Sequence, residues 1–257
     1  MTAVFQRLAP YGHIHHRALN SFAALDRAER YIATYPEIPQ VLEGDVCWNF
    51  EAGRRDLYFR HPSYVVDSLT TAEIDRQKGA KQLVTLDDLL ARHAAGKHYV
   101  LELKVGRGDA EIALRTLVET MQQHCRDQFW IDGFSLRLAQ TIKRIDPSVT
   151  TSLHTELAAA RHVLLDAPEW PPLRIVKLAD VCGVDAIAIR KRFSGAHMAR
   201  ACAAVQRHGF ALVLSRLFTP RDYELSRQWG AVAGYPKAPF DEIVRANAAY
   251  SKVTVPT

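Results

Sequence analysis

Short apolar segments alternate with helix-like segments along most of this chain, and this alternation constrains the fold more than any other feature. Strand-like runs occur at residues 13–16, 41–46, 99–104, 129–131, 150–154, 185–190, 210–215 and 230–234. Amphipathic segments separate most of them. About eight such units predict an α/β fold of the (β/α)8, or TIM-barrel, type. The 257 residues suit one domain of this kind, spanning residues 1–257.

Local signals support the predicted helices. A helix is expected to begin near Asn20 or Ser21, which are good N-caps. Another is expected after Thr85, where two acidic residues occupy the first turn. A further helix is expected over residues 173–181, and residues 47–80 are expected to be irregular apart from a short strand within residues 56–62 that proline ends. An open doubly wound sheet is less consistent with the sequence, since no glycine-rich phosphate turn follows the first strand.

Composition excludes several classes of function. The net charge of +5 comes from basic residues that are spread along the chain, so no nucleic-acid partner is predicted. No apolar stretch reaches the roughly 20 residues of a transmembrane helix. The N-terminus lacks a signal-peptide pattern, so a cytoplasmic location is expected, and the four scattered cysteines are expected to be free thiols. The pattern indicates no particular oligomeric state.

Two acidic strands carry the strongest indication of chemistry. Residues i and i+2 of a strand lie on the same face, so Glu43 lies with Asp45, and Glu102 lies with Lys104. If the two strands are parallel neighbours in a barrel, three carboxylates and one ammonium group meet at one rim. A hard divalent cation, which prefers oxygen ligands, would offset the repulsion between these carboxylates.

Other polar residues stand at the predicted strand ends, where barrel enzymes place their functional groups. They are His16, Arg17, His154, Arg190, Arg216 and Tyr235. Such a mouth suits an anionic substrate bridged by a metal, and phosphate is the natural candidate. His61 follows the second strand and is expected to fold back over the mouth, where two histidines would be able to exchange protons on either side of a phosphorus atom. Strand phase puts His15 and His16 on opposite faces and leaves open which one faces the site.

The order of these residues is recognisable. His16-Arg17, Glu43-x-Asp45, His61 and Glu102-x-Lys104 follow one another as in the glycerophosphodiester phosphodiesterase family, within the phospholipase-C-like phosphodiesterase TIM barrels. The helix start at residues 85–90 is also similar to that family's. The specific motifs lie in the first 104 residues, although the resemblance covers most of the chain.

The resemblance implies a phosphoric diester hydrolase that cleaves a glycerophosphodiester or a related small phosphodiester. It implies that His16 and His61 form the general acid/base pair. It further implies that Mg²⁺ or Ca²⁺ is held by Glu43, Asp45 and Glu102, and that the phosphate is held by Arg17 and Lys104. The implied partner is a small-molecule phosphodiester, and the implied context is lipid metabolism.

Four departures from the family pattern keep alternatives open. Ala18 replaces the usual glycine, the usual Glu-Asn-Thr stretch is reduced to Asn20-Ser21, Pro62 replaces the usual aspartate after the second histidine, and the segment from His61 to Thr85 is short. The short segment is similar to that of the compact phospholipase-D-like branch, which suggests cleavage of a lysophospholipid headgroup. A non-catalytic barrel that binds a phosphodiester is a further alternative. A metal-dependent lyase or aldolase that uses Lys104 as a base or Schiff-base amine is another.

Overall fold

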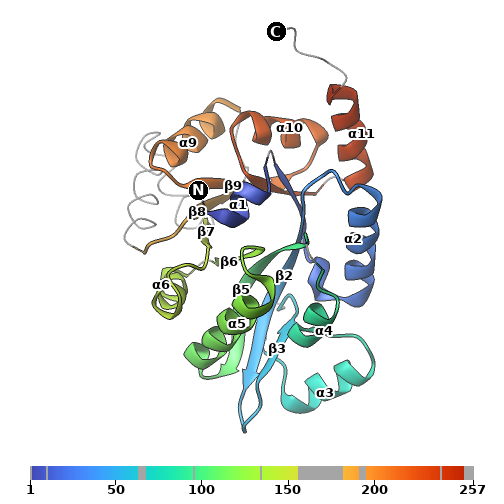
Figure 1. Cartoon of the computed structure of the whole chain (residues 1–257), viewed down its shortest axis with the longest axis vertical. Coiled ribbons are helices and arrows are strands. Elements are labelled where there is room, and N and C mark those ends of the chain that lie inside the picture. The colour runs from blue at the N-terminus through green and yellow to red at the C-terminus, as the bar shows by residue number, and fades with distance from the viewer. Residues whose placement is uncertain are drawn as a thin grey trace.

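A closed barrel of parallel strands forms the centre of the molecule. The computed structural model describes residues 2–9, 11–62, 68–94, 96–133, 135–155, 182–190, 195–237 and 239–251. Within these residues, eight parallel strands follow the order β1-β10-β9-β8-β7-β6-β5-β2, and β1 pairs with β2 to close the barrel. Figure 1 shows the helices arranged around these strands. The predicted (β/α)8 fold is confirmed.

The elements have the following bounds. The barrel strands are β1 (Gly12–His15), β2 (Gln40–Phe50), β5 (His98–Gly108), β6 (Phe129–Gly133), β7 (Thr151–Thr155), β8 (Ala186–Arg190), β9 (Ala211–Leu217) and β10 (Ala233–Pro236). Two antiparallel strands, β3 (Asp56–Phe59) and β4 (Val84–Thr85), extend the sheet beside β2. The helices are α1 (Ala3–Arg7), α2 (Phe22–Thr34), α3 (Thr71–Gly79), α4 (Leu86–Ala91), α5 (Ala110–Cys125), α6 (Leu136–Ile145), α9 (Gly195–Arg207), α10 (Pro220–Gln228) and α11 (Phe240–Ser251), and η1 (Ala18–Asn20) is a short 3-10 helix.

Side-chain caps fix the starts of several helices where the sequence predicts them. The Ser21 hydroxyl accepts a hydrogen bond from the Ala24 N–H at 3.2 Å and caps α2. Thr85 and Asp88 form a reciprocal capping box at α4. Each cap satisfies backbone N–H groups that the first helical turn leaves without partners. The expected helix over residues 173–181 lies outside the described residues.

The short strand expected within residues 56–62 is confirmed as β3, but the prediction that the rest of residues 47–80 is irregular is wrong. β2 continues to Phe50, β3 pairs antiparallel with it, and α3 follows. Helix α3 begins at a capping box formed by Thr70 and Glu73, and Ile74 is its one described buried residue. So little apolar surface gives almost no helical periodicity to detect. The last strand also begins later than expected, at Ala233, because Gly230 adopts a left-handed turn conformation with a φ of 71°.

Hydrophobic side chains fill the barrel at the end where its strands begin. Inward-facing residues of the strands form one buried cluster with Val4, Phe5 and Leu8 of the N-terminal segment. The ring of Phe5 lies 5.3 Å from the ring of Trp130, which β6 points into the barrel. Helix α1 therefore closes the end of the barrel that lies opposite the carboxyl ends of the strands.

The same strand alternation that builds this apolar layer gives a polar layer above it. Val41 and Val100 belong to the internal cluster, and the next inward positions on their strands are Glu43 and Glu102. On β6, Asp132 follows Trp130 in the same way. Polar side chains therefore gather at the carboxyl ends of the strands, where barrel enzymes hold their active sites.

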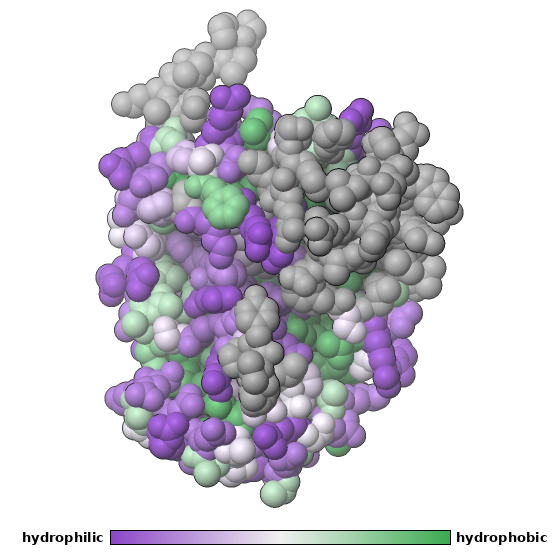
Figure 2. Space-filling view, turned by 180° about the vertical axis from the view of Figure 1, so that it is seen from behind, coloured by the Kyte–Doolittle hydropathy of each residue, from purple (hydrophilic) through white to green (hydrophobic). Residues whose placement is uncertain are grey.

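Figure 2 shows one face of the molecule, on which the coloured residues are largely hydrophilic with patches of hydrophobic residues among them. Among the described residues, no helix combines the length and apolar character needed to cross a membrane. The four cysteines are buried and form no disulfide, as expected from the sequence.

Gly44 separates Glu43 from Asp45 on β2, and its backbone is closely covered. A Cβ atom placed there would lie 2.7 Å from both Leu19 Cβ and Phe59 Cδ1. We expect Gly44→Ala to lower the free energy of unfolding by about 1–3 kcal/mol, the usual scale for overpacking a core. Chemical denaturation checks this. The matched control is Gly79→Ala, where no atom lies within 4 Å of the new Cβ, and an equal loss in both variants would contradict the packing argument.

Candidate active site

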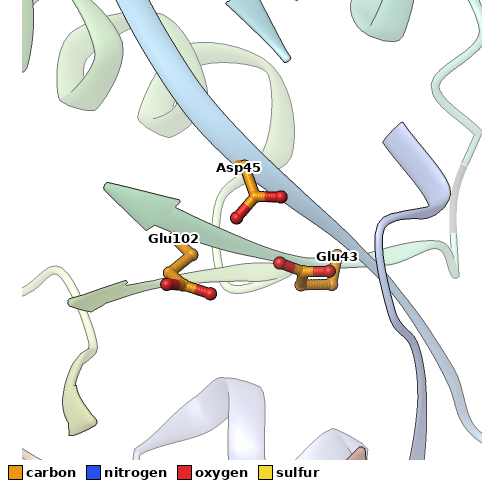
Figure 3. A group of neighbouring side chains, drawn as sticks. All are labelled: Glu43, Asp45 and Glu102. Atoms are coloured by element: carbon orange, nitrogen blue, oxygen red, sulfur yellow. The ribbon is translucent and has the colours of Figure 1, made fainter. Parts of the chain in front are cut away.

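Three buried carboxylates meet at the mouth of the barrel. Strand β2 points Glu43 and Asp45 inward, and the parallel register places Glu102 of β5 beside Asp45. One oxygen from each carboxylate lies within 4.8 Å of the others, and the exposed fractions of the residues are 0%, 1% and 6%. Figure 3 shows the carboxylates turned toward a common space. The structure thus brings together the three residues that the sequence grouped as ligands.

Donors from the neighbouring elements surround this triad of Glu43, Asp45 and Glu102. Lys104 Nζ lies 2.9 Å from Asp45 Oδ1 and also contacts the Glu102 carboxylate. The side chain of Asn20 both donates to Asp45 and accepts from its backbone N–H, the latter at 3.0 Å. These contacts orient the carboxylates and offset part of their charge.

Arg17 approaches the triad with its backbone as well as its side chain. Its φ of 60° is left-handed, and this conformation turns its N–H toward a Glu43 carboxylate oxygen. Its guanidinium Nε lies 3.7 Å from Asp45 Oδ2 and is about half exposed. The turn after β1 therefore carries one donor into the site and one cation to its rim.

Lys104 and Arg17 do not fully compensate the three carboxylates. Glu43 Oε1 is buried and has no hydrogen-bond partner within the described residues. Burial, followed by the charges of Asp45 and Glu102, raises the pKa of Glu43 well above its usual range. A buried oxygen without a partner, among carboxylates with converging oxygens, fits a hard divalent cation. The residues present therefore fit the metal that the sequence predicts.

His16 lies on the mouth side of β1, and His15 does not. Lys237 Nζ lies 3.0 Å from His16 Nδ1, and burial together with Lys237 and Arg17 lowers the pKa of His16 to about 3. In contrast, His15 Nε2 lies 2.7 Å from the side-chain oxygen of Gln40, and its ring stacks 5.9 Å from that of Tyr31. Strand phase alone left this choice open.

His61 stands just beyond β3 and is exposed. The preceding Arg60 N–H donates a 2.8 Å hydrogen bond to the Asp45 backbone carbonyl, which fastens this segment beside the triad. Burial lowers the pKa of His61, and the neighbouring Arg17 and Lys104 add to this effect against the opposing charge of Asp45. His61 thus experiences the charges of the triad region, although residues 63–67 after it lie outside the described part of the chain.

A second polar group inside the mouth centres on Asp132, which the sequence reasoning did not single out. Ser152 Oγ donates to Asp132 Oδ1 at 2.8 Å, and His154 Nδ1 lies 3.1 Å from Asp132 Oδ2. Tyr235 also reaches Asp132, at 3.4 Å. Asp132 is the register partner of Glu102, so this network borders the triad. Its only signal in the sequence is an acid at the end of the strand-like run Phe129–Ile131.

A cavity of about 410 Å³ lies on the other side of β1 from the triad. Side chains of β1, α2 and the segment before α11 line it, among them His13, Tyr31 and Phe240. His16 and Lys237 also line this cavity, so it adjoins the rim of the mouth.

Comparison with known proteins agrees with the barrel. No family model matches the sequence, and no curated protein matches it. A phosphodiesterase from Oleispira antarctica, solved with the product sn-glycerol-3-phosphate, superposes with a TM-score of 0.68 at 15% identity, over 95% of this chain and 99% of that chain. A glycerophosphodiester phosphodiesterase from Parabacteroides distasonis gives a TM-score of 0.65 at 15% identity, over 93% and 98% of the two chains.

This chain has the fold of the glycerophosphodiester phosphodiesterases. The carboxyl transferase domain of Rhizobium etli pyruvate carboxylase also superposes, with a TM-score of 0.55 at 13% identity over 91% of this chain and 41% of that one. Because barrels with different chemistry share this architecture, the side chains at the mouth must carry the functional argument.

The excess negative charge of the triad can be tested in protein from which metal has been removed. In chelated protein, Glu43→Gln should raise the free energy of unfolding at pH 8 by roughly 1–3 kcal/mol, the scale for relieving one unsatisfied buried group. The raised pKa of Glu43 sets the sign, because wild-type protein loses stability as pH rises through that pKa and the variant does not. Thermal melts at several pH values check this.

With excess Mg²⁺, the wild-type protein should become more stable to unfolding than Glu43→Gln, because a bound ion stabilises only the protein that binds it. Glu73→Gln is the control, because Glu73 lies exposed on α3 and only caps that helix. Equal responses of both variants to Mg²⁺ would contradict a cation site at the triad.

Proposed function

We propose that this protein is a metal-dependent phosphodiesterase that cleaves a glycerophosphodiester or a related small phosphodiester by two-histidine acid/base catalysis. The observation that carries this proposal is the buried triad with its unpartnered Glu43 oxygen, bordered by the cations Arg17 and Lys104. The likeness to phosphodiesterase structures supports it, one of them solved with sn-glycerol-3-phosphate.

Glu43, Asp45 and Glu102 would hold Mg²⁺ or Ca²⁺, since both ions prefer oxygen ligands. When bound, such an ion stabilises negative charge that develops on the phosphate oxygens and orients a hydroxyl group for attack. The chain's own contribution is to fix the carboxylates, which Lys104 and Asn20 do through their contacts with Asp45.

Arg17 and Lys104 would hold the phosphate. Burial works to lower the pKa of Lys104, but the neighbouring Glu102 and Asp45 outweigh it and raise this pKa. Lys104 therefore stays charged, as a phosphate-binding ammonium must. A Schiff-base lysine needs the opposite, a depressed pKa, so the environment of Lys104 disfavours the lyase or aldolase alternative.

His16 and His61 would move the protons. The low pKa of His16 keeps its ring neutral at physiological pH, so it can accept a proton from the attacking hydroxyl, and a phosphate bound beside it would raise this pKa toward the range of an effective base. His61 then donates a proton to the leaving alcohol from the exposed side of the mouth. Pro62 restricts the backbone of the residue before it to extended conformations, so the departure from the family pattern stiffens the support of His61.

Cleavage of a lysophospholipid headgroup is the second candidate, and one feature favours it. Between β3 and β4, the helical structure among the described residues is the nine-residue α3, which makes the described part of this connection short. A short connection at this point would leave room for a substrate that is still partly held in a lipid surface. Glycerophosphocholine and lysophosphatidylcholine, assayed side by side, distinguish the two candidates.

Removal of either histidine should slow turnover strongly. We expect His16→Ala and His61→Ala to lower kcat for glycerophosphodiesters by about 10²–10⁴-fold, the usual contribution of a general acid or base. EDTA should abolish activity and Mg²⁺ or Ca²⁺ should restore it. Release of alcohol, measured with a coupled assay, checks both expectations.

His208→Ala is the control for these variants, because His208 is exposed after α9. Full activity in either site variant would overturn the assigned role of that histidine, and activity that survives EDTA would overturn the metal. Tight binding of phosphodiesters without turnover under any metal would instead identify a non-catalytic binding barrel.

A further inference from the structure

The mouth of the barrel is divided by charge. Going around the barrel, β2, β5 and β6 are consecutive neighbours, and each ends in inward-facing acids, the triad and Asp132. The strands β1, β10, β9 and β8 are also consecutive, and each ends in a cation. These four cations are Arg17, Lys237, Arg216 and Arg190, in that order. The acidic half holds the proposed metal, and the proposed function gives the cationic half no role beyond Arg17.

Arg216 is placed at the mouth by an irregularity in the sheet. In the pairing of β9 with β10, Ser215 lies opposite Tyr235 and Leu217 lies opposite Pro236, so no β10 residue lies opposite Arg216 in the register. Its φ of 62° is left-handed, a costly conformation for arginine. Bulges of this kind re-aim a side chain and are common beside active sites.

Lys237 follows β10 and is held by its backbone, whose N–H donates to the Leu217 carbonyl at 2.7 Å. Burial lowers its pKa, and the cations Arg17, Arg216 and Arg190 lower it further against the opposing charge of Glu43. Each of these three arginines therefore lies near enough to Lys237 to repel its ammonium group. Within the described part of the chain, neither Arg216 nor Lys237 forms an ion pair with a carboxylate. A bound anion would relieve this repulsion.

We propose that Lys237, Arg216 and Arg190 form a second anion-binding subsite, which selects phosphodiesters whose alcohol portion carries another anionic group. This inference rests on the proposed function, because the phosphodiester itself is assigned to Arg17, Lys104 and the metal. The second group is a phosphomonoester or a carboxylate, since arginine guanidinium groups bind both in a bidentate manner. The contact of Lys237 with His16 places this subsite directly beside the reacting phosphate.

Two matched pairs of diesters test the subsite. Glycerophosphoserine differs from glycerophosphoethanolamine by one carboxylate, and glycerophosphoinositol monophosphate differs from glycerophosphoinositol by one phosphate. Binding is measured by titration calorimetry with Mg²⁺ on the His61→Ala protein, which should bind diesters without cleaving them. Turnover of the same four compounds is measured on the wild-type enzyme.

We expect at least one anionic member to bind 10-fold or more tightly than its neutral partner. The preference should fall below 3-fold when Arg216→Gln is added, and it should weaken as salt is raised. Arg216→Lys should restore part of it. Arg7→Gln is the matched control, because this substitution removes the same charge and Arg7 lies on α1 at the opposite end of the barrel. The pair that shows the preference identifies the second group as carboxylate or phosphate.

The outcomes separate this inference from the proposed function. Turnover of all four diesters with no preference in either pair, or a preference that Arg216→Gln leaves intact, would overturn the subsite and keep the phosphodiesterase. A preference that depends on Arg216, without turnover in the wild-type enzyme, would keep the subsite and overturn the catalytic proposal. Absence of both binding preference and turnover would overturn both.

Discussion

The parallel register between β2 and β5 is the constraint on which the rest of the mouth depends. It sets Asp45 directly beside Glu102, and strand alternation adds Glu43 to the same inner face. Three buried carboxylates in one place repel one another strongly in a medium of low dielectric. The contacts of Lys104, the left-handed turn at Arg17 and the paired hydrogen bonds of Asn20 all answer this repulsion. The compensation is incomplete, because one Glu43 oxygen has no hydrogen-bond partner among the described residues.

The fold tolerates this unfavourable layer because the layer beneath it is thoroughly apolar. Inward side chains from Ile14 to Ala233 pack with the N-terminal residues Val4, Phe5 and Leu8, and they leave the polar groups only at the open end. A second hydrophobic shell lies between the strands and the outer helices. Burial of this apolar surface is the main stabilising term of the barrel, and it offsets the charge crowding at the mouth.

The sequence predicts much of this arrangement because strand and cap signals are local. Alternation of segments predicts the barrel, Ser21 and Thr85 mark helix starts, and the spacing of Glu43, Asp45 and Glu102 predicts the triad. Features set by contacts between distant segments escaped prediction. Helix α3 buries little apolar surface, so its sequence shows no clear helical periodicity. Asp132 is recognised as a site residue only through its position beside Glu102 in the sheet. The contacts with Lys237 and Gln40 show that His16, and not His15, faces the mouth.

Anomalous diffraction from a crystal soaked in Mn²⁺ tests the central claim most directly, since this ion shares the oxygen preference of Mg²⁺. The structure predicts one strong anomalous peak bonded to carboxylate oxygens of Glu43, Asp45 and Glu102, with the unpartnered Glu43 oxygen among its ligands. Loss of the peak in Glu43→Gln would tie it to that oxygen. A fully soaked crystal with no peak between these carboxylates, or with the ion bound only elsewhere, would contradict the account.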